Sequence, residues 1–271
     1  MRQEADELKL RYFTDISHEL RTPLTLISVP VEAILENKRL EKKDEERLII
    51  ANNNIIKLHN LIDELIDYRK ISQGKMKVNE EPVEIIGYLK SVYSAFLNIS
   101  KAKNLDYGFN SNRDKGYCLF DTAILDKIMF NLISNAIKYT PDYGQVKLQV
   151  DIINETGFKI NITNTGQGIP TKYQNMIFER FFQLPGGQSK ESGSGIGLSI
   201  VKDYVDLLGG NITVESEPDV LTTFKLFLPY KKIKEGYIKG KTFSKHTEVE
   251  CVQKQQHETL KTFELPEIPH I

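Results

Sequence analysis

His18 is the residue whose surroundings in this sequence most favour chemistry. It stands two residues from the apolar Ile16 and Leu20 of a helical pattern, so its imidazole is expected to face solvent. A neutral imidazole nitrogen is a good nucleophile near neutral pH, and the adjacent Glu19 could hold its tautomer or take its proton. Thr22 lies one turn further on the same face, where its hydroxyl could position a water molecule. A lone surface histidine usually has no such role, so an inert surface residue is the alternative.

A second group of polar residues follows in the middle of the chain. Asn131 and Asn135 are one helical turn apart, so both amides should point the same way. An amide oxygen can bind a hard cation such as Mg²⁺ without adding charge. An ordinary polar helix face is the alternative.

Two glycine-rich segments, 164–170 and 193–198, come after the asparagines. Glycine lets a backbone approach a ligand closely. The second segment opens a predicted helix at Gly197, and backbone amides at a helix N-terminus suit phosphate oxygens. One glycine-rich turn alone is weak evidence, but the two after the asparagine pair strengthen each other.

An apolar stripe with steps of three and four residues predicts that His18 lies on a long helix. The stripe consists of Phe13, Ile16, Leu20, Leu24, Ile27, Val31 and Ile34. After the charged residues 38–47 it returns on a second helix, which Gly74 would end. There it consists of Leu48, Ala51, Ile55, Leu58, Ile62 and Leu65. Residues 1–74 are therefore predicted to form a helical hairpin. One hairpin buries its seam poorly, so a homodimer with a four-helix bundle is expected.

Residues 75–230 mix the helical periodicity of three to four residues with the two-residue alternation of strands. Helices are expected at 82–102, 122–138 and 197–208, the first preceded by a short strand. Alternating patterns predict strands at 146–153, 158–163, 212–216 and 222–228. The polar loop 166–195 has the length of a lid or binding loop. Helices on one face of a mixed sheet give an α/β sandwich, and residues 231–271 are predicted to be a linker.

Composition excludes several classes of function. The 271 residues carry 36 Lys and Arg against 37 Asp and Glu, a net charge of -1, which argues against a nucleic-acid binder. The two cysteines, Cys118 and Cys251, have no metal-like spacing and fit a reducing compartment. No apolar run approaches the roughly 18 to 20 residues of a membrane span, so no membrane contact by this part of the protein is expected.

Residues 13–24 resemble the H-box of sensor histidine kinases of two-component systems, in its HisKA form. The resemblance implies that His18 accepts a phosphoryl group and that Glu19 assists as a base. It also implies that Thr22 serves a reverse, phosphatase reaction.

The second region resembles the ATP-binding domain of the same family. The resembling segments are the N-box at 131–141, the G1 box at 164–170, the F-box at 178–182 and the G2 box at 193–198. By this resemblance Asn135 coordinates Mg²⁺ between the ATP phosphates and Asn131 supports it, while Lys138 and Tyr139 contact phosphate and nucleotide. The G1 and G2 glycines implied to line the nucleotide are Gly166, Gly168, Gly193, Gly195 and Gly197.

Asn164 departs from the family pattern, which usually has aspartate there to accept a hydrogen bond from the adenine amino group. Asparagine can still accept through its carbonyl oxygen, but the bond loses its charge assistance. An alternative function is therefore a phosphatase-dominant protein or a dimeric signalling scaffold that does not bind ATP.

The resemblance implies a GHKL (Bergerat) ATPase fold, ATP and Mg²⁺ as cofactors, and a response-regulator receiver domain as partner, in cis or in trans. The chain would be the cytoplasmic portion of a sensor protein in a bacterial inner membrane. The tail would lead to a receiver domain, as in hybrid kinases. A third alternative, an ATP-driven chaperone or topoisomerase, shares the fold but has no H-box hairpin.

Overall fold

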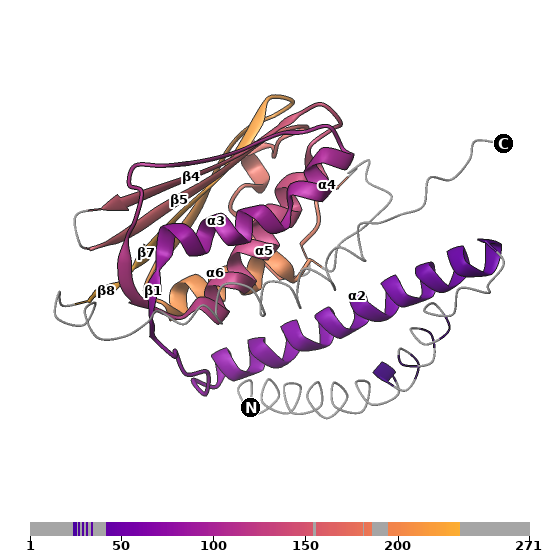
Figure 1. Ribbon diagram of the computed structural model, residues 1–271, viewed down its shortest axis with the longest axis horizontal. Helices are drawn as coiled ribbons and strands as arrows, with labels where there is room; N and C mark the ends of the chain where they lie inside the picture. Colours follow the sequence, from indigo (N-terminus) through magenta and orange to yellow (C-terminus); the bar gives the residue numbers. More distant parts are fainter. Residues whose placement is uncertain are drawn as a thin grey trace. The chain divides into compact units, whose positions relative to one another are not determined.

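The computed structural model describes residues 42–153, 156–180, 182–185 and 195–233, together with residues 24, 25, 27, 29, 31 and 34. These residues fall into two units, divided between Met76 and Lys77 (Figure 1). Within the described ranges, no helix combines the length and apolar character that crossing a bilayer requires.

The first unit is dominated by helix α2, Lys42–Ser72. The helix ends as predicted, because Gly74 takes a left-handed φ of 61° that residues other than glycine rarely adopt. Lys75 N–H then donates to the Lys70 carbonyl at 2.8 Å, which satisfies one of the last helical acceptors.

The predicted apolar stripe of α2 is only partly buried. Ile55 and Ile62 are buried, whereas Leu58 in the same stripe is 43% exposed. Ile27 and Ile34 of the first predicted helix are also exposed. One copy of the chain therefore leaves part of this apolar seam in contact with water.

The second unit contains a five-stranded mixed sheet, with its strands in the order β2-β4-β5-β7-β6. The strands are β2 Asp106–Ser111, β4 Gln145–Ile153, β5 Gly157–Thr165, β6 Asn211–Glu217 and β7 Leu221–Pro229. Strand β2 runs parallel to β4, and the other neighbours are antiparallel. The predicted hairpin of β4 and β5 and the closing strands β6 and β7 are confirmed.

Helices cover one face of this sheet, as the α/β sandwich prediction requires (Figure 1). They are α3 Ile85–Ala95, α4 Leu97–Ala102, α5 Thr122–Tyr139 and α6 Gly197–Leu207. The apolar face of α5 is buried together with the inward side chains of the central strands. These buried side chains include Leu125, Ile128, Met129, Leu132, Leu148, Val150, Ile160 and Ile162. Burial on this scale fixes the helix that carries the paired asparagines.

Two expectations are corrected by the structure. The helix predicted for 82–102 is interrupted at Phe96, whose buried ring packs against Phe130 with a centroid separation of 5.0 Å. The predicted linker 231–271 begins too early, because Lys231–Lys232 form strand β8. Backbone pairing with Cys118 and Leu119 and the burial of Ile233 tie these residues to the second unit.

Strand β8 completes a small three-stranded sheet, in the order β1-β3-β8. Its other strands are β1 Glu81–Glu84 and β3 Tyr117–Phe120. Asp121 directly follows β3 and caps the start of α5, accepting from the Ile124 N–H at 3.0 Å. The same carboxylate accepts from the Asn79 N–H at 2.7 Å, so one side chain ties α5 to the chain that enters the domain.

Candidate functional site

Helix α5 places the two predicted asparagines against each other. The Asn135 side-chain N–H donates to the side-chain carbonyl oxygen of Asn131, with 3.1 Å between the heavy atoms. Both residues are half-buried on the same face of the helix. This bond orients the Asn135 amide and leaves its carbonyl oxygen as the end that can act as an acceptor or a cation ligand.

The start of α6 packs directly onto this pair. A Cβ atom at Gly197 would lie 2.5 Å from the side-chain nitrogen of Asn131, a distance that real Cβ contacts do not reach. Gly195, just before the helix, has a φ of 71°. One of the predicted G2 glycines, Gly197, therefore lies beside the predicted N-box residue Asn131, and the N-terminal amides of α6 lie on this side of the domain.

The G1 loop approaches the other end of α5. A Cβ at Gly166 would collide with the Tyr139 carbonyl oxygen, well inside van der Waals contact. Gly168 has a φ of 66°, and its Cβ would lie 2.5 Å from the Glu217 carbonyl oxygen. Sequence reasoning assigned these glycines to a close approach of a ligand. The structure adds that both are needed for the loop to pack on its own neighbours.

Two side chains that the sequence did not reveal, those of Ser216 and Gln174, form hydrogen bonds to the backbone of the G1 loop. Ser216 accepts from the Ile169 N–H at 2.8 Å, and its hydroxyl also lies 2.8 Å from the Thr222 hydroxyl. The Gln174 amide donates to the carbonyls of Ile169 and Ser216, at 3.0 and 2.8 Å. Neither residue belongs to a recognisable motif, because each also makes a contact across the fold, Ser216 with Ile169 and Gln174 with the Ser216 carbonyl.

Asn164 is buried in β5, where the strand register places it opposite Thr222 of β7. Its side-chain N–H donates to the Thr165 carbonyl oxygen at 3.2 Å. The carbonyl oxygen of the same amide is the acceptor that remains for a ligand. The adenine contact expected from the resemblance stays a prediction, and an amide at this position would make it without a full negative charge.

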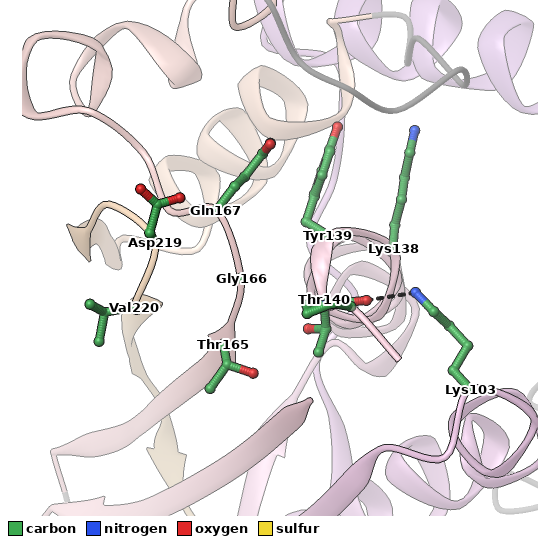
Figure 2. Close-up of a pocket in the computed structure, with 10 residues that line it drawn as sticks. Lys103, Lys138, Tyr139, Thr140, Thr165, Gly166, Gln167, Asp219 and Val220 are labelled. Atoms are coloured by element: carbon green, nitrogen blue, oxygen red, sulfur yellow. Dashed lines mark hydrogen bonds between the residues drawn. The ribbon is translucent and has the colours of Figure 1, made fainter. Parts of the chain in front are cut away.

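An open pocket of about 590 Å³ lies between the end of α5, the G1 loop and the turn from β6 to β7. Its lining residues are Lys103, Lys138, Tyr139, Thr140, Pro141, Thr165, Gly166, Gln167, Asp219 and Val220. Figure 2 shows Lys138 and Tyr139 side by side at the end of the helix, with Gly166 and Gln167 across from them. The Lys138 ammonium lies 5.4 Å from the Tyr139 ring centroid, within the range of a cation–π interaction.

The predicted site residues are brought together only in part. Lys138, Tyr139 and Gly166 line the pocket. The asparagine pair lies earlier in α5, where Asn131 contacts Gly197. His18, Glu19, Thr22 and Gly193 lie outside the described residues. Across the described ranges, no cluster of histidine, cysteine or acidic residues could hold a metal ion by itself. A cation here would have to share its coordination between an amide such as that of Asn135 and a ligand's own oxygens.

Two family matches define the class of this chain, one for an ATPase domain and one for a phospho-acceptor domain before it. The family described as "Histidine kinase-, DNA gyrase B-, and HSP90-like ATPase" matches residues 120–232. The family described as "His Kinase A (phospho-acceptor) domain" matches residues 8–74. The chain belongs to the sensor histidine kinases of two-component systems, which combine these two domains. The match at residues 8–74 supplies the phospho-acceptor domain that the chaperone or topoisomerase alternative lacks.

Relatives agree with this assignment. Hybrid signal transduction histidine kinase D of Dictyostelium discoideum is 34% identical over 247 residues, which are 89% of this chain and 16% of that protein. Histidine kinase P4 of Formosa agariphila is 34% identical over 231 residues, 84% of this chain and 17% of that protein. The chain thus spans about a sixth of the length of these relatives.

Solved structures show the same fold. Full-length ShkA in complex with AMPPNP has a TM-score of 0.69 and 24% identity, covering 82% of this chain and 46% of that one. Histidine kinase ThkA in complex with response regulator protein TrrA has a TM-score of 0.56 and 20% identity, covering 84% of this chain and 66% of that one.

Proposed function

We propose that this chain transfers the γ-phosphoryl group of ATP to His18 and then passes it to an aspartate of a response-regulator receiver domain. The observation that carries the proposal is the order of the two domains, a phospho-acceptor domain at 8–74 followed by an ATPase domain at 120–232. An acceptor and a donor in one chain supply both halves of a phosphoryl transfer.

The proposed nucleotide site uses the residues that α5 and its neighbours position. Asn135 directs its carbonyl oxygen to Mg²⁺, and the bond from its N–H to Asn131 fixes that orientation. When bound, Mg²⁺ offsets the negative charge on the phosphates. Lys138 and Tyr139 contact phosphate and nucleotide at the end of the helix, and Asn164 accepts from the adenine amino group.

The glycines of the site have two proposed roles. Gly166 and Gly168 let the G1 loop lie against α5 and the β6–β7 turn, which keeps the nucleotide side of the loop open. The backbone amides near Gly193, Gly195 and Gly197, at the start of α6, donate to phosphate oxygens.

His18 is the proposed nucleophile. Its imidazole nitrogen forms a bond to the γ-phosphorus while the bond from that phosphorus to the β,γ-bridging oxygen breaks, which releases ADP. Glu19 takes the proton that the imidazole loses. Thr22 orients the water that hydrolyses the phosphorylated receiver in the reverse activity.

The proposed assembly is a homodimer built on the helical hairpin. The exposed side chains of Ile27, Ile34 and Leu58 support it, because a second copy would remove this apolar surface from water. The solved complex of ThkA with the response regulator TrrA supports a receiver domain as the second partner. Whether His18 is phosphorylated within one subunit or across the dimer follows from the handedness of the hairpin.

The remaining proposals concern the whole protein. The domain limits are proposed as 1–74 for the hairpin and from 75 to the end of β8 for the ATP-binding domain. The residues that follow are proposed to lead to a receiver domain, as the hybrid kinase among the relatives suggests. We also propose that this part of the protein works in the cytoplasm, behind a membrane sensor.

Incubation of the purified chain with Mg²⁺ and γ-³²P-ATP tests the proposed reaction. The wild type is expected to acquire label that is stable in base and lost in acid, as a phosphorus–nitrogen bond requires. The His18→Ala protein is expected to acquire none, because it lacks the nucleophile. His59 of α2 offers a matched control, since His59→Ala should label like the wild type. Acid-labile label on the His18→Ala protein would refute the assignment.

A second candidate function rests on Asn164. If the uncharged amide binds adenine too weakly, the protein acts mainly as a phosphatase or a dimeric scaffold, with Thr22 as the active residue. Titration with Mg-ATP by calorimetry separates the two functions, because a scaffold would show no binding at millimolar nucleotide.

Asn164→Asp is expected to tighten ATP binding by about fivefold, because a charge-assisted hydrogen bond contributes about 1 kcal/mol more than a neutral one. The affinity of both proteins would be measured by calorimetry, with Asn161→Asp on the same strand as a control for added charge. Equal affinities in Asn164→Asp and the wild type would show that this side chain does not contact the base.

A further inference from the structure

Lys103 links the end of α4 to the end of α5, although 34 residues separate it from its nearer partner. Its ammonium donates to the Ile137 carbonyl at 2.9 Å. It also donates to the Thr140 carbonyl at 2.7 Å, the bond that Figure 2 draws as a dashed line. Both are carbonyls at the C-terminal end of a helix, which lack a partner within the helix. A cation at this end also interacts favourably with the helix dipole.

The same residue supports the turn that follows α5. The Lys103 carbonyl accepts from the Tyr143 N–H at 3.2 Å, and Tyr143 has a left-handed φ of 63°. Thr140 closes the helix from within, donating its hydroxyl to the Ala136 carbonyl at 2.6 Å. Lys103 therefore makes hydrogen bonds both to the last turn of α5 and to the turn that follows it.

The two carbonyls that Lys103 binds flank Lys138 and Tyr139. Both of these residues line the pocket, and the Tyr139 carbonyl is the atom against which Gly166 packs. A shift of this last helical turn would move two pocket side chains and the support of the G1 loop together. Half-burial of Lys103 also lowers the pKa of its ammonium from the usual value, although two acceptors hold it in place.

We propose that Lys103 is a positioning residue for nucleotide binding, which sets the last turn of α5 so that Lys138, Tyr139 and the G1 loop face the nucleotide. The proposal rests on the proposed function, since it concerns the same nucleotide site. Lys103 acts through the backbone of α5, and it lies outside the motifs that resemble the family's ATP-binding boxes.

The test compares ATP affinity and thermal unfolding of the full chain in the wild type, Lys103→Met, Lys103→Arg and Lys101→Met. Lys101 is an exposed lysine in the last turn of α4, two residues before Lys103, and serves as the matched control. Lys103→Met should weaken ATP binding by about tenfold, because two charged hydrogen bonds to the helix end are lost. Lys103→Arg should recover most of the affinity, since a guanidinium can donate to two carbonyls, and Lys101→Met should bind like the wild type.

Autophosphorylation separates positioning from a general loss of structure. In Lys103→Met the KM for ATP should rise, while the rate at saturating ATP stays within about threefold of the wild type. Wild-type affinity in Lys103→Met, or no recovery in Lys103→Arg, would overturn the proposal. If Lys103→Met does not fold, Lys103→Gln replaces it, and failure of both to fold would make the lysine structural and also overturn the proposal. Absence of ATP binding by the wild type would instead refute the proposed function.

Discussion

Asn135→Ala is expected to lower autophosphorylation by about a hundredfold or more while the domain stays folded. The substitution removes the amide oxygen proposed to coordinate Mg²⁺, and a lost preorganised electrostatic contact costs 10² to 10³ in rate in other enzymes. It should not disturb the fold, because the described side-chain bond of Asn135 runs to Asn131 on the same helix, and alanine favours helices. Initial rates of label transfer from γ-³²P-ATP at fixed Mg²⁺ measure the effect.

Ser134→Ala is the matched control for this prediction. Ser134 neighbours Asn135 on α5, and its hydroxyl donates to the backbone carbonyl oxygen of Asn131 at 3.0 Å. Its loss should change the rate by less than about fivefold, because a bond of this kind contributes about 1 kcal/mol. A rate for Asn135→Ala as high as that of Ser134→Ala would contradict the metal role. Thermal unfolding should show both proteins folded.

Gly166→Ala is expected to abolish detectable ATP binding and to reduce the free energy of unfolding by about 2 kcal/mol, as overpacking of a tight contact does. The added Cβ would collide with the Tyr139 carbonyl, so the G1 loop and the end of α5 must separate. Because backbone atoms rather than a flexible side chain receive the collision, the strain cannot be relieved by a rotamer change. Calorimetric titration with Mg-ATP and chemical denaturation measure the two effects.

Gly108→Ala provides a comparison in the same unit. Gly108 lies in the edge strand β2, and the nearest atom to an added Cβ there is the Lys147 Cγ at 3.9 Å, an ordinary contact. This variant should bind ATP and unfold like the wild type. If Gly166→Ala matched it in both measurements, the close packing of the G1 loop would have no functional weight.

Strong local periodicity explains which elements could be predicted. The two-residue alternation of β4 and β5 and the amphipathic pattern of α5 are determined by burial of one face, which single-sequence patterns record. Strands β2 and β3 were missed because Asp106–Ser111 is polar and exposed for a strand, and Tyr117–Phe120 is short. The break at Phe96 was missed because the residues on either side continue the helical pattern.

The site residues also divide into those that a local pattern reveals and those that only the fold reveals. Asn131, Asn135 and the glycines could be predicted as site residues because their spacing along the chain suggests the chemistry. Lys103, Ser216 and Gln174 were missed because they act across the fold on backbone atoms, and a single sequence does not record such pairs. The conformational reason for Gly166 and Gly168 also needed the structure, since it lies in their contacts with Tyr139 and Glu217.

Localisation of the phosphoryl group tests the central claim most directly. The wild type would be incubated with Mg-ATP, digested at neutral or basic pH and analysed by tandem mass spectrometry under conditions that preserve phosphohistidine. We expect one major phosphopeptide, with the phosphoryl group on His18, and about a hundredfold less of it, or lower, when Asn135→Ala replaces the wild type. A phosphoryl group on another residue, or ATP hydrolysis with no covalent phosphate on the protein, would contradict the account.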